Sequence, residues 1–146
     1  MEKLNFEEIQ AFIESKHGSV VVVDMWATWC PPCVKEFPNL VKLQAKHDLK
    51  DLVCISVSFD FQGIDPIDEV RQTVLEFLQS KNAEIVNILS TEESDILSRK
   101  LGIASIPVVY VYDRAGNLVR RFSDSNGKHD GYEEIEKLVS ELIIAK

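Results

Sequence analysis

The sequence predicts an α/β fold in which helices cover both faces of a mixed central sheet. Helical and strand patterns alternate along most of the chain, which favours parallel strands joined by right-handed crossovers. The strand patterns at 19–26 and 52–59 are almost continuously apolar, as expected of central strands that are covered on two sides. Two later strand patterns follow one another without a helix, which indicates an antiparallel hairpin on one side of the sheet.

The first half of the chain supplies two helices besides the two central strands. The first helix is expected over residues 5–16, with Asn5 as its N-cap and acidic residues in its first turn. The second is expected from about residue 31 to 46. Pro38 lies inside this second helix and should kink it, because proline lacks a backbone donor and clashes with the preceding turn.

The second half supplies three more helices and three strands. An additional helix is expected at about 66–81, because Asp65 and Pro66 match an N-cap and a first helical position. Residues 90–93 resemble a capping box that opens a short helix. The other expected elements are a strand at 83–89, the short helix ending at 101, hairpin strands at 107–112 and 117–122, and a last helix at about 131–144.

Length and charge limit the classes of partner. The 146 residues, 45% of them hydrophobic, are enough for one globular domain over residues 1–146. The net charge of -8 argues against nucleic acid and anionic membranes, which both favour basic patches. No apolar run reaches the roughly 18–20 residues that a membrane-spanning helix needs. We therefore expect a monomer with no nucleic-acid partner and no membrane span.

The compartment depends on how the chain begins. The first residues, MEKLNFEEIQ, lack the charged and then apolar pattern of a secretory signal. The protein is therefore expected in the cytoplasm, or in an extracytoplasmic space such as the periplasm if a signal was removed before this chain was made.

Two of the three cysteines flank a Pro-Pro pair, in the segment WCPPC. A strand followed by a helix would put Cys30 at the helix N-cap and Cys33 at the third helical position. Their Cβ atoms would then lie roughly 5–6 Å apart, close to the spacing that a disulfide requires. Such a bond closes only a tiny loop and adds little stability, so the pair is not explained as a staple.

Cys30 is the predicted nucleophile. Its sulfur would face unpaired backbone donors and the positive end of the helix dipole, which both favour the thiolate. Pro31 costs nothing at the first helical position, where the amide has no intrahelical partner. Pro32 removes one of the amides that could hydrogen-bond the sulfur. The two prolines are therefore expected to make a rigid turn. Once Cys30 has formed a mixed disulfide with a substrate, Cys33 would attack and resolve it.

Asp24 is the second unusual residue. It lies in an apolar strand, six residues before Cys30, where burying an acid is costly. A desolvated carboxyl group has a raised pKa, and it could take the proton of Cys33 when that thiol resolves a mixed disulfide. The alternative is an aspartate at the strand end that reaches water. The residue pattern alone leaves both interpretations open.

Together these residues resemble the thioredoxin superfamily over essentially the whole chain. In that family the matching positions are a buried acid, a packing aromatic, the active site, a helix kink and a cis-proline that faces the dithiol. The resemblance therefore implies a thioredoxin-like fold, a cis peptide bond before Pro107, and substrate docking beside Trp29, Ile106 and Pro107. The residues that carry it are Asp24, Trp26, Trp29-Cys30-Pro31-Pro32-Cys33, Pro38 and Ile106-Pro107.

Within the superfamily, WATWCPPC and the additional helix at about 66–81 are most similar to the TlpA/ResA-like thiol-disulfide oxidoreductases. These proteins are typically extracytoplasmic and keep particular client cysteines reduced. The chain departs from the pattern in two ways. We expect only a helix at the N-terminus, without the β-hairpin leader of that group, and the strand around 54–58 offers no lysine to pair with the buried acid.

We therefore predict a thiol-disulfide oxidoreductase that reduces protein disulfides through Cys30 and Cys33, with no cofactor beyond this redox-active pair. Its partners would be cysteine-containing proteins and an upstream reductase or membrane electron donor. Cys54, in mid-strand, is expected to be a small buried hydrophobic residue. Two alternatives stand beside this prediction. One is metal binding, for which CxxC supplies half of a tetrahedral zinc site; the other is a non-catalytic thioredoxin-like interaction module.

Overall fold

The computed structural model describes residues 1–123 and 131–145. Six strands form one sheet in the order β1-β4-β3-β2-β5-β6. The strands are β1 (Glu2–Leu4), β2 (Val20–Trp26), β3 (Leu52–Ser58), β4 (Val86–Ser90), β5 (Val108–Tyr112) and β6 (Leu118–Ser123). The helices are α1 (Phe6–Glu14), α2 (Pro31–Ala45), α3 (Ile67–Ser80), α4 (Ser94–Leu101) and α5 (Gly131–Ile144).

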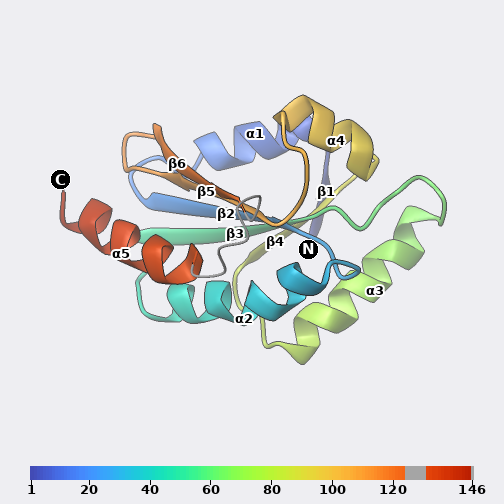
Figure 1. Cartoon of the computed structure of the whole chain (residues 1–146), viewed down its shortest axis with the longest axis horizontal. Helices are drawn as coiled ribbons and strands as arrows, with labels where there is room; N and C mark the ends of the chain where they lie inside the picture. The colour runs from blue at the N-terminus through green and yellow to red at the C-terminus, as the bar shows by residue number, and fades with distance from the viewer. Residues whose placement is uncertain (124–130, 146) are drawn as a thin grey trace.

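Helices cover both faces of the sheet, as Figure 1 shows. Helices α1 and α4 lie on one face, and α2, α3 and α5 lie on the other. Strands β1, β4, β3 and β2 run parallel, whereas β5 pairs antiparallel with β2 and β6 pairs antiparallel with β5. The predicted mixed sheet with a C-terminal hairpin on one side is therefore confirmed.

The core is centred on the two strands that the sequence marked as buried on both faces. Every residue of β2 and of β3 is buried. At the end of β2, the ring of Trp26 packs against Phe37 of α2 and Phe77 of α3, with ring centroids 4.5 Å and 5.1 Å away, and the centroids of the two phenylalanine rings lie 5.5 Å from each other. Aromatic pairs at this spacing add to the stabilisation from apolar burial. This cluster therefore fixes the N-terminal half of α2 on the sheet.

Strand β1 is an element that the sequence analysis missed. It pairs in parallel with β4 at the edge of the sheet, and the amide of Thr91 donates a 2.9 Å hydrogen bond to the carbonyl oxygen of Leu4. Three residues are too few for a strand to show an alternating pattern. The free edge of β4, which lies far away in the sequence, supplies the pairing.

Some helix starts differ from the predicted ones. Asn5 is the N-cap of α1, as predicted, and forms a capping box with Glu8. Pro66 is the N-cap of α3 rather than its first helical residue. The capping box expected at 90–93 is wrong, because Ser90 is the last residue of β4 and its hydroxyl accepts the Glu92 amide within a turn.

Arg114, in the turn between β5 and β6, joins distant segments. Its guanidinium donates to the carbonyl oxygens of Gly18 and Lys50, at 3.0 Å and 3.3 Å. It also donates to the Asp51 carboxylate at 3.0 Å and to the carbonyl oxygen of Ile143 at 2.9 Å. Arg114 thus ties the hairpin turn, the loop before β3 and the end of α5 together.

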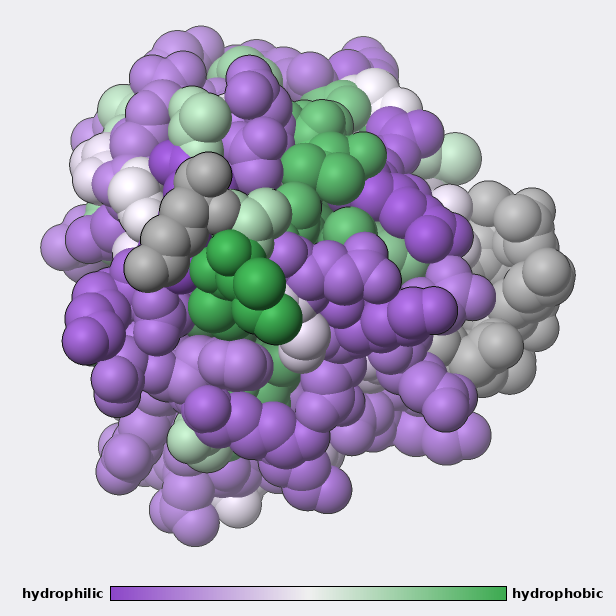
Figure 2. Space-filling view, turned by 90° about the vertical axis from the view of Figure 1, so that its left-hand side faces the viewer, coloured by the Kyte–Doolittle hydropathy of each residue, from purple (hydrophilic) through white to green (hydrophobic). Residues whose placement is uncertain are grey.

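Figure 2 shows the side of the molecule toward which α5 ends, where apolar residues form a band among hydrophilic ones.

Replacing Arg114 by alanine is expected to lower the free energy of unfolding by about 2–3 kcal/mol, because it removes four hydrogen bonds, of which those to Asp51 and Ile143 are partly buried. Arg120→Ala is the matched control. Its guanidinium forms an exposed ion pair with Glu134, so we expect a loss of less than about 1 kcal/mol. Urea unfolding of both variants measures the difference, and equal losses would contradict this role of Arg114.

Candidate active site

The two cysteines lie at the N-terminus of α2, directly after the loop that follows β2. Cys30 is the N-cap, Cys33 is the third helical residue, and a disulfide joins them with their Cα atoms 5.3 Å apart. These are the positions that the sequence predicts. Cys30 keeps 6% of its surface exposed and Cys33 only 1%. A client sulfur atom therefore reaches Cys30 more easily than Cys33.

The two prolines between the cysteines shape the start of the helix. Pro31 and Pro32 occupy its first two positions, and neither has an amide hydrogen. The amide of Val34 donates a 3.0 Å hydrogen bond to the carbonyl oxygen of Cys30. Of the first three helical amides, only that of Cys33 remains as a donor. The turn is therefore rigid and offers few hydrogen bonds to the Cys30 sulfur.

A groove of about 430 Å³ opens beside Cys30, with Trp29, Phe59 and Ile106 among its walls. The peptide bond between Ile106 and Pro107 is cis, as the resemblance implies. The Ile106 carbonyl oxygen lies 3.8 Å from the Cys30 sulfur, and half of the Trp29 surface is exposed, at 50%. The structure thus brings Trp29 and Ile106 together at the groove, whereas Pro107, which follows Ile106, lines a separate pocket. The role of these three residues in docking stays a prediction.

Asp24 is buried in β2 with only 2% of its surface exposed, so the alternative in which it reaches water is wrong. Its Oδ2 atom accepts a 2.9 Å hydrogen bond from the hydroxyl of Tyr132 on α5. Burial raises the pKa of Asp24 to about 7; the Tyr132 hydrogen bond partly offsets this rise, and the charge of Glu36 adds to it. A carboxyl group with a pKa near neutrality is suited to both accepting and returning a proton.

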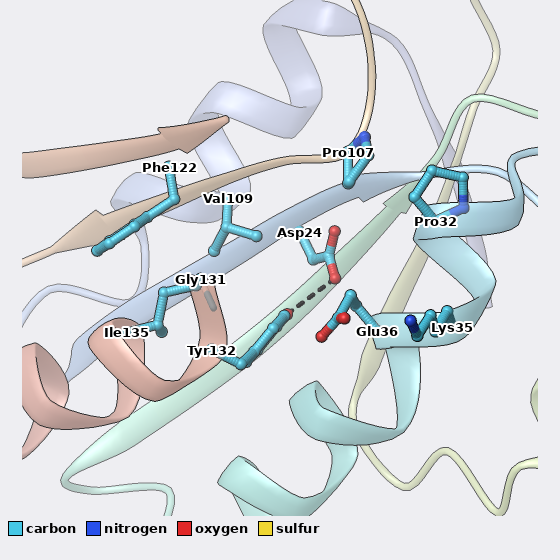
Figure 3. Close-up of a pocket in the computed structure, with 10 residues that line it drawn as sticks. All are labelled: Asp24, Pro32, Lys35, Glu36, Pro107, Val109, Phe122, Gly131, Tyr132 and Ile135. Carbon is cyan, nitrogen blue, oxygen red and sulfur yellow. Dashed lines mark hydrogen bonds between the residues drawn. The ribbon is translucent and has the colours of Figure 1, made fainter. Parts of the chain in front are cut away.

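A pocket of about 100 Å³ borders Asp24. Figure 3 shows Asp24 between Tyr132 and the first turns of α2, with Pro107 and Pro32 beyond its other carboxylate oxygen. The pocket therefore connects the buried acid with the turn that carries the cysteines. Its walls are Asp24, Pro32, Lys35, Glu36, Pro107, Val109, Phe122, Gly131, Tyr132 and Ile135.

Tyr132 and Glu36, which also line this pocket, were not predicted from the sequence as site residues. Tyr132 lies on the inward side of the last helix, where a tyrosine hydroxyl usually needs a hydrogen-bond partner. That requirement was a signal pointing to a buried polar atom such as Asp24. Glu36 follows Cys33 by three residues, a spacing that places both on one face of α2. The spacing was visible in the sequence, but which helix face meets Asp24 was not.

Asp60, which follows β3, holds the active-site loop, and it too was missed. Its carboxylate accepts the amide of Thr28 at 3.0 Å, the Thr28 hydroxyl, and the Ser58 hydroxyl at 2.6 Å. Thr28 immediately precedes Trp29 in the segment WATWCPPC. These hydrogen bonds therefore tie the loop to the end of β3. An acid directly after an apolar strand was the available signal.

Trp26, Pro38 and Cys54 lie away from the groove. Trp26 is fully buried and packs on Phe37, in agreement with a packing role. Helix α2 continues through Pro38 as one element, and the expected kink stays a prediction. Cys54 is a free buried thiol in β3. Burial, with a further contribution from the charge of Asp24, raises the pKa of Cys54 far above its ordinary value, which favours the unreactive thiol.

Within residues 1–123 and 131–145, no group of three or more His, Cys, Asp or Glu side chains is arranged to hold a metal ion. Over the same residues, no helix is both long and apolar enough to cross a bilayer.

Sequence comparison relates the chain to a family of redox proteins. The Redoxin family model matches residues 8–138. The thiol-disulfide oxidoreductase ResA of Bacillus thuringiensis subsp. konkukian is 25% identical over 123 residues, which cover 83% of this chain and 64% of ResA. The thiol:disulfide interchange protein HelX of Rhodobacter capsulatus is 26% identical over 123 residues, covering 84% of this chain and 62% of HelX. The chain thus spans less than two thirds of either relative.

Comparison with solved structures supports the fold. A thiol-disulfide isomerase from Corynebacterium glutamicum superposes with a TM-score of 0.71 at 16% identity, covering 90% of this chain and 84% of the other. A thiol:disulfide interchange protein of the thioredoxin family from Chlorobium tepidum TLS gives a TM-score of 0.62 at 22% identity, covering 89% and 83%. The predicted thioredoxin-like fold is therefore confirmed.

Asp24→Asn is expected to stabilise the oxidised protein in a pH-dependent way. The folded state holds a proton on Asp24 that the unfolded chain releases between the ordinary pKa of 3.8 and about 7. Stability therefore falls as pH rises through this interval, and the penalty is complete above it. Asparagine removes the penalty, so we expect a gain of up to about 4 kcal/mol at pH 8 and little gain at pH 3.5.

Denaturant unfolding at the two pH values measures this effect. Asp48→Asn serves as the control, because Asp48 is exposed and its substitution should change little at either pH. A gain for Asp24→Asn that is the same at both pH values would contradict the raised pKa.

Proposed function

The chain belongs to the Redoxin family, and on that premise we propose that it is a thiol-disulfide oxidoreductase that reduces protein disulfides through Cys30 and Cys33. One observation carries the proposal. A bonded cysteine pair lies at the N-terminus of α2, with the more exposed sulfur beside the Ile106 backbone and an open groove. The resemblance of WATWCPPC to the TlpA/ResA-like group points to the same activity.

The reaction is two successive thiol-disulfide exchanges. In the reduced protein, the Cys30 thiolate attacks one sulfur of a client disulfide; the client S–S bond breaks and its other sulfur leaves as a thiolate. Cys33 then loses its proton to Asp24 and attacks the Cys30 sulfur. The bond between Cys30 and the client breaks, the second client thiolate leaves, and the Cys30–Cys33 disulfide forms. Two electrons pass to the client, whose thiolates take up protons.

Recycling requires a second partner. A dithiol of an upstream reductase, or of a membrane electron donor, runs the same exchanges in reverse and returns two electrons to the pair. Clients are cysteine-containing proteins that dock beside Trp29 and the cis bond between Ile106 and Pro107. Exposed Trp29 offers an apolar face next to Cys30, and the Ile106 backbone offers hydrogen-bonding groups to an extended client segment.

The remaining parts of the proposal concern the setting of the reaction. The redox-active pair needs no bound cofactor, and the protein acts as a monomer outside the cytoplasm, as the TlpA/ResA-like resemblance suggests. We further propose that residues 1–146 work as a single domain. In support, the six strands share one sheet, and helices from both halves of the chain pack on its faces.

Trapping tests the chemistry directly. Cys33→Ser is expected to accumulate a covalent Cys30–client disulfide, because the resolving sulfur is gone while the nucleophile remains. Cys30→Ser should form none, and Cys54→Ser, the control, should turn over like the wild-type protein. Non-reducing electrophoresis with mass spectrometry of a disulfide-containing peptide client identifies the adduct. No adduct on Cys30 would refute the proposal and favour the interaction module.

The direction of electron flow has its own test. We expect a reversible two-electron couple for Cys30 and Cys33, nearer the roughly -270 mV of thioredoxin than the roughly -120 mV of a strong oxidant. Titration of Cys54→Ser in defined thiol buffers measures it through tryptophan fluorescence and the free-thiol count. A midpoint at the oxidising end would reverse the direction, and the absence of any couple would favour metal binding.

A further inference from the structure

The two oxygens of the Asp24 carboxylate have different surroundings. Oδ2 accepts the Tyr132 hydroxyl at 2.9 Å, whereas Oδ1 is buried and has no hydrogen-bond partner among the residues that the structure describes. A buried carboxylate oxygen without a partner is costly. Figure 3 shows that this free oxygen points away from Tyr132, toward Pro107 and Pro32. The open position of Asp24 thus faces the turn that carries the cysteines.

The hydrogen bond also connects two elements that are far apart in the sequence. Tyr132 is the second residue of α5, and Asp24 is in the middle of a central strand, 108 positions earlier. The tyrosine ring forms a wall of the pocket beside Asp24, opposite the prolines (Figure 3). A rigid aromatic side chain on a helix is well suited to fixing the direction of a carboxylate, because it has few rotatable bonds.

We propose that Tyr132 is a positioning residue for proton transfer: it holds Oδ2 of Asp24, so that Oδ1 stays directed at the turn between the two cysteines, and the proton later leaves through the adjoining pocket. This inference rests on the proposed function. During resolution the Cys33 S–H proton moves to Oδ1, the Cys33 thiolate attacks the Cys30 sulfur, and the client leaves as a thiolate. Asp24 then returns its proton to water at the pocket, and the client thiolate takes one from solvent.

The groups around Asp24 determine whether removing the Tyr132 hydroxyl raises or lowers the pKa of Asp24. Glu36 and Lys35 line the pocket from α2, Tyr132 lines it from α5, and the Cys54 thiol lies close on β3. A donated hydrogen bond stabilises the carboxylate, so Tyr132 lowers the pKa of Asp24 against the effects of burial and Glu36. Losing the hydroxyl therefore raises this pKa above about 7, and the basic form appears only at higher pH.

The test follows the resolving step alone in Tyr132→Phe, a substitution that removes only the hydroxyl. The reduced protein is mixed with one equivalent of 5,5′-dithiobis(2-nitrobenzoate), which releases one coloured thiolate when Cys30 attacks and the second when Cys33 resolves. The wild-type rate of the second release should rise with a midpoint near pH 7. In Tyr132→Phe the midpoint should move up by about one pH unit, which slows the step about fivefold at pH 7 and approaches about tenfold at lower pH.

At alkaline pH, where Asp24 is ionised in both proteins, the two rates should converge, which a merely structural role for Tyr132 would not produce. Tyr112→Phe is the matched control; this β5 tyrosine makes no hydrogen bond to Asp24, and its loss should leave the midpoint unchanged. In an Asp24→Asn background, Tyr132→Phe should have no further effect on the rate. An unmoved midpoint, or an equal slowing at every pH, would overturn the proposal.

A second measurement does not depend on turnover. Carbon-13 NMR of the Asp24 carboxyl group in the oxidised protein reports its titration directly, and Tyr132→Phe should shift that titration to higher pH. If the wild-type protein released no second thiolate, the proposed function would fail. The carboxyl titration would then decide the coupling of Tyr132 to Asp24 by itself, and an unshifted curve would overturn it.

Discussion

The packing of α2 against the end of β2 is the interaction on which the rest of this structure depends. Trp26, the last residue of the strand, packs against Phe37 of α2 and Phe77 of α3, and these two rings also contact each other. Because only a short loop separates Trp26 from Cys30, this cluster fixes where the helix begins and therefore where both sulfurs lie. Asp60 completes the fixation by holding Thr28 within that loop. The position of the redox site is thus set by apolar packing and by the hydrogen bonds of the Asp60 carboxylate.

The same packing also buries an acidic side chain, which raises the free energy of its charged form. Covering β2 on both faces removes Asp24 from water, and the strand supplies no lysine to balance its charge. Tyr132 of α5 brings a hydrogen bond to Asp24 but no charge. The carboxyl group is left with a pKa of about 7, and its Oδ1 has no hydrogen-bond partner among the described residues. Because burial raises this pKa, Asp24 makes the folded protein less stable near neutral pH than in acid.

The sequence was sufficient for the features that local patterns determine. The uninterrupted apolar strands, the N-cap position of Cys30 and the late hairpin all follow from neighbouring residues, and the structure has each of them. What it could not supply were pairings between distant segments. Strand β1 exists because β4 offers an edge, and Tyr132 meets Asp24 only after α5 has folded back onto the sheet. Short elements and long-range side-chain partners leave no periodic trace in the sequence.

Pro32 is a wall of both the groove beside Cys30 and the pocket beside Asp24. A single pyrrolidine ring therefore separates the surface that a client covers from the space that borders the buried acid. Under the proposed function a client covers the groove, and the pocket beside Asp24 is a separate space. In the proposed reaction, client recognition and proton transfer would therefore take place in two spaces that share the Pro32 side chain. Under that proposal, substitutions in the groove alone would change which clients bind and leave the surroundings of Asp24 as they are.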